Sequence, residues 1–347
     1  MHILVTGNMG YVGSVLVETI RENLTGATIT GLDNGYFASC LTRTPAVMPE
    51  TLLDRQLFYD VRDLGENIFE NVDAVIHLSA VSNDPMGNLY KKATDEINHQ
   101  SSLNIAKEAK NAGVQKFVFA SSCSVYGQAE SASRTEDSEV NPLTPYARSK
   151  VEAEEGLRDL ADPDFHVTCL RFATACGPSP RLRLDLVLND FVTDALVNGN
   201  ITILSDGSPW RPLIDVRDMG KALVWAAAFQ NASQPFSLFN AGCNDWNFQV
   251  RDLAFEVQKV LGGTEVSINS EAAPDKRSYK VDFSRFAEAA GGFAPEREIS
   301  ETISALRELL VSFEFEEKDF RGSDLIRLRY LDKLIGKGLL DEGLRWG

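Results

Sequence analysis

The stretch His2-Ile3-Leu4-Val5-Thr6-Gly7-Asn8-Met9-Gly10-Tyr11-Val12-Gly13 passes from an apolar run straight into a glycine-rich turn. The apolar run predicts a buried strand over 2–6, and a helix is expected directly after the turn, over 12–22. Glycines between a strand and a helix let the backbone approach a pyrophosphate closely, and the helix N-terminus then faces that negative charge. The spacing is G-x-x-G-x-x-G rather than G-x-G-x-x-G, and a glycine triplet alone is weak evidence for a dinucleotide site. Its position directly between a strand and a helix makes that evidence stronger.

An acidic residue follows at the distance typical of a dinucleotide site. Asp33 lies 20 residues beyond Gly13, at the end of the second predicted strand. A carboxylate there accepts hydrogen bonds from the adenosine ribose and repels a 2′-phosphate, so NAD is expected rather than NADP. Asp60 and Val61 follow the third predicted strand and are candidates to contact the adenine, although a pair of exposed loop residues is an equally good interpretation.

Apolar runs alternate with helix-like stretches through the first half of the chain, which is typical of a doubly wound parallel sheet. Six strands are predicted there, over 2–6, 28–32, 56–59, 74–78, 116–122 and 166–172. The helices between them include 98–112 and 146–160. Residues 74–78 and 116–122 are apolar on both faces, as expected for strands covered by helices on each side. The predicted fold class is therefore α/β, with a Rossmann-type doubly wound parallel sheet.

The pattern changes after Phe172, where Gly177-Pro178-Ser179-Pro180-Arg181 forms a turn-rich break. The predicted NAD-binding domain spans 1–173, with returns to its sheet near 213–240, at 213–216 and 237–240. A smaller, discontinuous α/β region for the substrate takes 174–212 and 241–312 and contains an apolar helix at 185–197. Residues 313–347 are expected to form peripheral C-terminal helices.

Composition and charge argue against several classes of protein. Residues 1–7 lack the basic start of a secretory signal, and no apolar run reaches the roughly 18 residues that span a bilayer, so a cytoplasmic protein without a membrane partner is expected. Five widely spaced cysteines and four histidines favour neither a disulfide framework nor a metal site. The net charge of −16 repels phosphate backbones, which makes nucleic acid a poor partner.

Three residues form a candidate catalytic set. Tyr146 and Lys150 are four apart, and a helix that begins at Pro145 places both on one face. A tyrosine with a pKa near 10 is a poor base at neutral pH, so a neighbouring cation such as Lys150 is needed to stabilise the phenolate. Ser122 ends the fifth predicted strand at the carboxyl edge of the sheet, where such folds bind ligands, and its hydroxyl can bind the alcohol or carbonyl being converted.

These motifs resemble the extended short-chain dehydrogenase/reductase family, particularly its NAD-dependent nucleotide-sugar epimerase/dehydratase branch, from Ile3 to about Leu310. Val75-Ile76-His77-Leu78-Ser79-Ala80 looks like the family's strand beside the cofactor, and Ser124-Val125-Tyr126-Gly127 matches its S/T-V-Y-G turn. Asn98 falls where the family has an active-site asparagine, whereas His77 is interpreted as a core histidine. The predicted cofactor contacts are Gly7, Met9, Gly10, Tyr11, Val12, Gly13, Asp33, Asn34, Asp60, Val61, Leu78, Ser79, Ala80, Asn98, Ser121, Tyr146, Lys150 and Phe172.

The resemblance also implies the roles of the catalytic set. Tyr146 is the expected base, Lys150 assists it and orients the nicotinamide ribose, and Ser122 shares the proton. Tightly bound NAD is the implied cofactor and a nucleotide-diphosphate sugar the implied substrate. A homodimer is implied as well, in which the helices at 98–112 and 146–160 pack against their mates.

The stretch Ser122-Cys123-Ser124 bears on the type of reaction. Dehydratases of the family carry an Asp-Glu pair beside the catalytic hydroxyl, and decarboxylases a glutamate, but no carboxylate is present here. Enzymes that epimerise at C3 and C5 resemble this chain in a Ser-Ser-Cys run, yet Cys123 directly follows Ser122 and alternation should turn it into the core. What remains is transient oxidation and reduction at C4, that is, 4-epimerisation. An NAD(P)-dependent 4-keto-sugar reductase or dehydrogenase uses the same residues and is the main alternative. A sugar-nucleotide dehydratase and an NAD-binding sensor without turnover are further, less favoured alternatives.

The second region is expected to select the sugar and its nucleotide. Arg211 resembles the family arginine that binds the diphosphate, and Arg277, in the run 275–279, resembles the second; guanidinium groups bind phosphate oxygens bidentately. A surface salt bridge is the alternative role for either. Asn189 is a candidate diphosphate donor. The predicted substrate contacts are Ser82, Ser122, Cys123, Ser124, Tyr146, Thr174, Asn189, Arg211 and Arg277.

Overall fold

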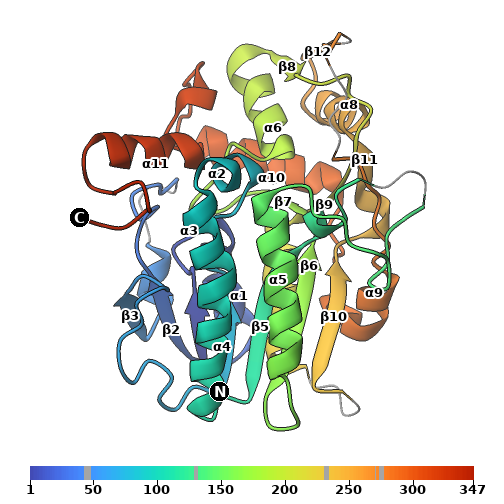
Figure 1. Cartoon of the computed structure of the whole chain (residues 1–347). Coiled ribbons are helices and arrows are strands. Elements are labelled where there is room, and N and C mark those ends of the chain that lie inside the picture. The colour runs from blue at the N-terminus through green and yellow to red at the C-terminus, as the bar shows by residue number, and fades with distance from the viewer. Residues whose placement is uncertain (43–47, 129–131, 230–233, 270, 273–276) are drawn as a thin grey trace.

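The computed structural model describes residues 1–42, 48–128, 132–229, 234–269, 271–272 and 277–347. Its centre is a parallel sheet of seven strands in the order β10-β6-β5-β4-β1-β2-β3 (Figure 1). The strands are β1 (His2–Thr6), β2 (Thr28–Asp33), β3 (Arg55–Phe58), β4 (Ala74–His77), β5 (Lys116–Ser122), β6 (His166–Phe172) and β10 (Phe236–Ala241). The predicted Rossmann-type fold is confirmed, and the six predicted strands lie within one residue of their predicted ends.

Helices cover both faces of this sheet. Alternate residues of β1 point to opposite faces, so Ile3 and Val5 belong to one buried cluster and Leu4 to the other. On the first face the cluster includes residues of α1 (Tyr11–Asn23) and α7 (Val216–Ala228); on the second it includes residues of α4 (Ser101–Asn111) and α5 (Pro145–Leu160). Figure 1 shows α4 and α5 side by side in front of the sheet. The carboxyl ends of the strands are thereby left as the edge where side chains can form a site.

The second region forms its own small sheets. One has the order β11-β9-β7, and in the other β12 pairs with β8. These elements are β7 (Thr174–Cys176), β8 (Asn200–Ile203), β9 (Trp210–Asp215), β11 (Asn247–Gln249) and β12 (Glu265–Ile268), with α6 (Val187–Asn198), α8 (Val250–Leu261) and α10 (Ile299–Ser312). The predicted return to the central sheet at 237–240 is confirmed by β10. The return predicted at 213–216 is wrong, because β9 pairs with β7 and β11 instead.

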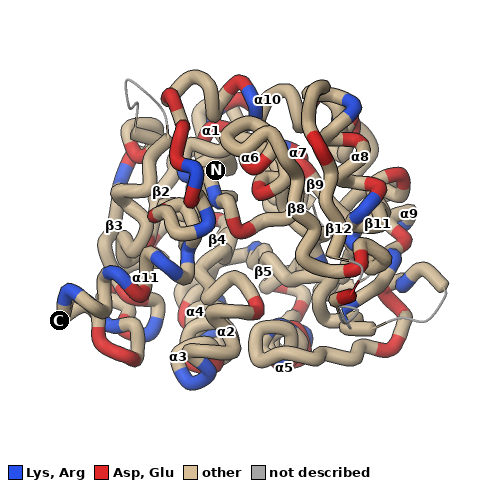
Figure 2. Tube along the Cα trace, turned by 90° about the horizontal axis from the view of Figure 1, so that it is seen from above, with Lys and Arg blue, Asp and Glu red and all other residues tan. Residues whose placement is uncertain are grey.

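The remaining helices are α2 (Asp84–Leu89), α3 (Lys91–Asp95), α9 (Ser284–Ala290) and α11 (Arg327–Gly336), with a π-helical stretch at Glu96–Gln100 before α4. The expectation that 313–347 is peripheral is wrong for its last part. Leu331 and Leu334 of α11 are buried in the same cluster as Leu57 of β3. Figures 1 and 2 both place α11 and the C-terminus on the side of the molecule where β2 and β3 lie. Among the described residues, no helix has the length and apolar character needed to cross a membrane.

Candidate active site

The turn between β1 and α1 has a backbone that only glycine allows. Gly7 has a φ of +76°, and a Cβ there would lie 2.8 Å from the backbone nitrogen of Ser79. A Cβ on Gly13 would lie 2.2 Å from the Gly7 carbonyl oxygen. These contacts are closer than atoms tolerate, so the glycines are needed for β1, α1 and the loop after β4 to meet. The result is a tightly packed loop at the carboxyl end of β1 whose Gly7 and Gly10 border a cavity.

The N-terminus of α1 is suited to a negative group. No side chain caps it, and its first turn holds no acidic residue. Its backbone N–H groups and the positive end of the helix dipole therefore favour an anion such as a diphosphate. Asp33, at the end of β2, accepts hydrogen bonds from the backbone N–H groups of Met9 at 3.0 Å and Gly35 at 2.8 Å. Burial raises the pKa of Asp33, and these two hydrogen bonds act against the rise.

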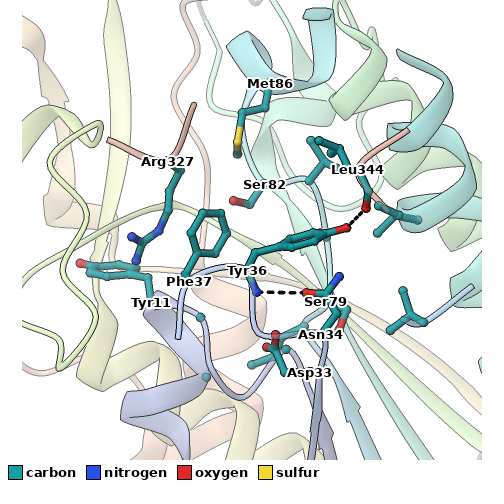
Figure 3. Close-up of a pocket in the computed structure, with 18 of the residues that line it drawn as sticks. Tyr11, Asp33, Asn34, Tyr36, Phe37, Ser79, Ser82, Met86, Arg327 and Leu344 are labelled. Carbon is teal, nitrogen blue, oxygen red and sulfur yellow. Dashed lines mark hydrogen bonds between the residues drawn. The ribbon is translucent and has the colours of Figure 1, made fainter. Parts of the chain in front are cut away.

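A cavity extends from this turn along the ends of β1, β2 and β4. We call it the glycine-loop cavity, and Figure 3 shows its lining. Twelve of the predicted cofactor contacts line it: Gly7, Gly10, Tyr11, Val12, Gly13, Asp33, Asn34, Asp60, Val61, Leu78, Ser79 and Ala80. Asp60 also forms an ion pair with Arg62 at 2.6 Å, so its carboxylate is held by its own loop. The glycine turn, the uncapped helix and the Asp33 carboxylate together fit a dinucleotide.

Two predicted cofactor contacts line neither this cavity nor the next. Met9 is buried, and its N–H is used by Asp33. Asn98 is buried in the π-helical stretch; its Oδ1 accepts from the Val81 N–H at 2.8 Å and its Nδ2 donates to the Val81 carbonyl at 3.0 Å. Direct contact of either residue with the cofactor stays a prediction. Asn98 fixes the backbone of the loop that follows β4.

A second cavity adjoins the first and shares Tyr11, Ser82 and Arg183 with it. We call it the tyrosine cavity, because Tyr146 lines it together with Lys150 and Ser122. The side chain of Thr144 caps α5 by accepting from the Ala147 N–H at 3.2 Å, and Pro145 occupies the first turn. The start of the helix is thereby fixed, and with it the position of Tyr146 at the carboxyl end of β5. The structure thus brings all three predicted catalytic residues together, along with Ser121 and Phe172.

The surroundings of Tyr146 act on its pKa in both directions. Burial raises the pKa of Tyr146 to about 12, whereas its hydrogen bond with Ser122 and the charge of Arg183 lower that pKa. The ammonium of Lys150 donates to the Ala120 carbonyl at 2.7 Å and lies 4.6 Å from the centre of the Phe119 ring. Burial also lowers the pKa of Lys150 to about 8. The Lys150 ammonium is thus held at the end of β5, 5.9 Å from the centre of the Tyr146 ring, and Ser122 and Arg183 are the groups that lower the pKa of Tyr146 directly.

The depressed pKa of Lys150 predicts a pH-dependent stability. The pKa is about 8 in the folded protein and 10.5 in an unfolded chain, so between these values the unfolded chain binds a proton that the folded protein lacks. The free energy of unfolding of the NAD-free protein should therefore rise across this interval, by about 2–3 kcal/mol relative to Lys150→Met. Urea unfolding of both proteins at several pH values measures this difference. If the free energies of unfolding of the two proteins changed equally with pH, Lys150 would not be buried as described.

A buried network lies behind the tyrosine cavity. Ser121 donates to Glu154, and Glu154 forms an ion pair with Arg171 at 2.6 Å. Arg171 also donates to the Tyr126 hydroxyl at 3.0 Å, which in turn donates to Asn240 Oδ1 at 2.7 Å. The sequence analysis did not predict this network. Two features of the sequence indicate a buried ion pair: Arg171 lies inside the apolar run 166–172, and Glu154 lies one helical turn after Lys150. It joins α5 to β6 and β10 and so fixes the end of β5.

Five further predicted substrate contacts belong to the tyrosine cavity. Ser82, Ser124, Thr174, Arg211 and Arg277 line it. Asp84 accepts from Arg277 at 2.7 Å and from the Thr144 hydroxyl at 2.6 Å, which ties this arginine to the start of α5. Residues 275 and 276 of the predicted run lie outside the described residues.

Two predicted substrate contacts, Cys123 and Asn189, line neither cavity, and their contact with a substrate stays a prediction. Cys123 is 1% exposed and donates to the Arg171 carbonyl at 3.1 Å, in agreement with its interpretation as a core residue. Asn189 is fully buried; its Oδ1 accepts from the Gly177 N–H at 2.9 Å and its Nδ2 donates to the Arg183 carbonyl at 2.8 Å. His77 is a core residue as interpreted, between the hydroxyls of Thr6 and Ser102, and burial lowers its pKa to about 3.

Arg183 is a site residue that the sequence did not predict. It lines both cavities, donates to Ser82 Oγ at 2.9 Å and forms a bidentate pair with Asp185. Asn83 donates to the same carboxylate at 2.7 Å. This buried pair places a guanidinium where the two cavities meet.

Comparisons with known proteins agree with this geometry. A model of the NAD dependent epimerase/dehydratase family matches residues 3–242, which is more than half of the chain, and the chain belongs to this family. A UDP-glucose 4-epimerase from Yersinia enterocolitica is 29% identical over 293 residues, covering 76% of this chain and 83% of the relative. A putative UDP-arabinose 4-epimerase from Arabidopsis thaliana is 29% identical over 294 residues, covering 77% and 66%.

Among solved structures, MoeE5 in complex with UDP-glucuronic acid and NAD is 25% identical, with a TM-score of 0.75. The match covers 90% of this chain and 99% of MoeE5, so a tenth of this chain has no counterpart there. The cofactor of this family is NAD, and the glycine-loop cavity has the features that bind it.

Proposed function

We propose that this protein is an NAD-dependent nucleotide-sugar 4-epimerase that works through a transient 4-keto sugar. The observation that carries the proposal is the tyrosine cavity, which adjoins the glycine-loop cavity and is lined by Ser122, Tyr146 and Lys150 together with Arg211 and Arg277. Such a cavity can hold the sugar beside the cofactor and the diphosphate between the arginines. The relatives named above act on UDP-sugars, which supports the substrate class.

The glycine-loop cavity would hold NAD, which would supply reversible hydride transfer at C4 of the sugar, from one face and back to the other. Tyr146 removes the proton of the C4 hydroxyl and later gives it back, so the protein ends in its starting state. Ser122 forms a hydrogen bond with the Tyr146 phenol and can bind the same sugar oxygen. Lys150 has a pKa of about 8, so below that pH its ammonium contributes positive charge to the cavity.

Inversion at C4 requires the sugar to turn while the nucleotide stays bound. Arg211 lies on β9 and donates to the Trp210 carbonyl at 2.9 Å, and Arg277 is held by Asp84. Both arginines belong to the second region, and Arg277 is linked through Asp84 to Thr144 at the start of α5. Two such anchors can bind the diphosphate oxygens without fixing which face of the sugar meets the cofactor.

Elimination of water has less support. The acids that line the tyrosine cavity, Asp84 and Asp185, are engaged by Arg277 and Arg183 respectively. The turn Ser122-Cys123-Ser124 offers no carboxylate. A proton at C5 therefore has no free acceptor at the place where dehydratases of the family carry theirs.

The experiment is to incubate the purified protein with its bound NAD against a panel of UDP-, dTDP-, GDP- and CDP-sugars. Product is followed by NMR and the NADH absorbance band is recorded. Inverted C4 with no net NADH is the expected result. Net change in NADH would assign a reductase or dehydrogenase, and a 6-deoxy-4-keto or 5,6-unsaturated product would assign a dehydratase.

We also propose that the protein is a homodimer through the outer face of α4 and α5. These helices pack closely, since a Cβ on Gly156 would lie 2.7 Å from Leu103 Cδ1, and they lie side by side on one side of the sheet (Figure 1). Light scattering coupled to size-exclusion chromatography should give twice the chain mass of 38.2 kDa. A mass of one chain at micromolar concentration would reject the dimer.

A further inference from the structure

The C-terminal segment, residues 320–347, forms part of the wall of the glycine-loop cavity. Arg327, Leu331 and Leu344 line it, although the family model ends at residue 242. The segment is held in place at its end. Tyr36 donates to the Leu344 carbonyl (Figure 3), and Arg62 donates to the carbonyls of Gly343 at 2.7 Å and Leu344 at 2.9 Å. This wall is therefore a built part of the cavity.

Arg327 brings a positive charge into this wall. Its side chain is 1% exposed, and its guanidinium lies 4.5 Å from the centre of the Phe37 ring. Nη2 donates to the Arg181 carbonyl at 2.8 Å, but Nη1 is buried and has no hydrogen-bond partner. Among the described residues, no carboxylate forms an ion pair with it, whereas Arg181 is paired with Glu50 and Arg183 with Asp185.

A buried cation without an ion pair is costly, and a buried N–H without an acceptor adds to the cost. The environment reflects this cost, since burial lowers the pKa of Arg327 to about 10. An anion in the cavity would supply both the missing charge and the missing acceptor. The same cavity is lined by Gly10 and Tyr11 at the N-terminus of α1, and in Figure 3 Arg327 and Tyr11 lie at the same end of it. This end is the place where a helix N-terminus attracts a diphosphate.

We propose that Arg327 binds the diphosphate of NAD, and that the C-terminal segment thereby completes the cofactor site. The glycine turn would contact the diphosphate from one side and Arg327 from the other. The proposal rests on the use of NAD, which the family establishes, and not on the reaction at C4. Cofactor binding can be measured without any sugar, so its failure and that of the proposed function are distinguishable.

The test compares Arg327→Met and Arg327→Gln with Arg329→Met. Arg329 is exposed on the same helix and lines neither cavity, which makes it a matched control. Affinities of the NAD-depleted proteins for NAD, ADP-ribose and adenosine are measured by calorimetry, with competition NMR for the weakest ligand. Both Arg327 variants should bind NAD and ADP-ribose about 10- to 100-fold more weakly, as expected for the loss of a buried charged hydrogen bond. Adenosine, which lacks the diphosphate, should bind all the proteins alike.

Thermal unfolding of the NAD-depleted proteins separates ligand binding from a structural role. Arg327→Met removes an unpaired buried charge, so its unfolding temperature should equal or exceed that of the wild type. Unchanged affinity for ADP-ribose, or an equal loss for adenosine and ADP-ribose, would overturn the proposal. If Arg327→Met does not fold, Arg327→Gln is used, because it keeps a donor for the Arg181 carbonyl. Its affinities for ADP-ribose and adenosine, each relative to wild type, then decide the question.

Discussion

Replacing Tyr146 with Phe should lower kcat on the true substrate by about 100- to 10,000-fold, the range expected when a general base is lost. In the proposed mechanism the phenol exchanges a proton with the sugar, and the hydroxyls of Ser122 and Ser124, which line the same cavity, are much weaker bases. The variant keeps the aromatic ring, so the packing of α5 is unchanged. NAD content and substrate affinity should stay close to wild type. Steady-state kinetics with product detection by NMR measures the effect.

Tyr90→Phe is the matched control for this experiment. It removes a tyrosine hydroxyl that donates to Asp332 at 2.9 Å, and Tyr90 lines neither cavity. Its kcat should remain within about twofold of wild type, as is usual for a change away from the chemistry. Full turnover by Tyr146→Phe would assign the proton transfer to another group and reject the mechanism.

Replacing Gly13 with Ala should abolish stable retention of NAD, with affinity lowered by about 100-fold or more. The added Cβ would lie 2.2 Å from the Gly7 carbonyl and 2.6 Å from the Asn8 Cα, so the loop must move away from α1. Backbone shifts of this kind cost about 1–3 kcal/mol even in an adaptable core, and this loop is the surface that meets the diphosphate. The measurement is the NAD content of the purified protein, followed by calorimetric titration.

Gly292→Ala controls for the loss of a glycine elsewhere. A Cβ at Gly292 would meet no atom within 4 Å, and its φ lies outside the left-handed region. This variant should copurify with as much NAD as the wild type. If Gly13→Ala also retained NAD, the turn would not be the cofactor loop.

The features that could be predicted from the sequence are those formed by residues close together in the chain. Strands such as β5, at Lys116–Ser122, are buried on both faces and therefore read as continuous apolar runs, so their ends were predicted closely. The glycine turn and the pair of Tyr146 and Lys150 are local patterns with a fixed geometry. The local conformation of such patterns can be predicted from a few neighbouring residues. The structure places both patterns at the same edge of the sheet.

The features that could not be predicted are contacts between distant parts of the chain. Tyr36 and Leu344 meet although 308 residues separate them, and no local signal marks residues 320–347 as part of a cavity. The run 213–216 is apolar like a strand of the central sheet, but an apolar run does not specify its partner strand. Asn98 and Asn189 are buried polar residues near the site whose side chains bond to backbone groups and also donate to the hydroxyls of Ser149 and Tyr11. Whether a buried amide faces a ligand or a backbone group depends on how distant segments pack around it. The residues next to the amide in the sequence do not show this.

Transfer of the C4 hydrogen is the most direct test of the central claim. A UDP-sugar labelled with deuterium at C4 is incubated with the protein and its bound NAD in ordinary water, and the product is analysed by NMR and mass spectrometry. The account predicts an epimer with inverted C4 that retains the deuterium at C4, because the hydride returns to the carbon it left. Deuterium lost to solvent, or found in released NADH with an oxidised sugar as product, would contradict it.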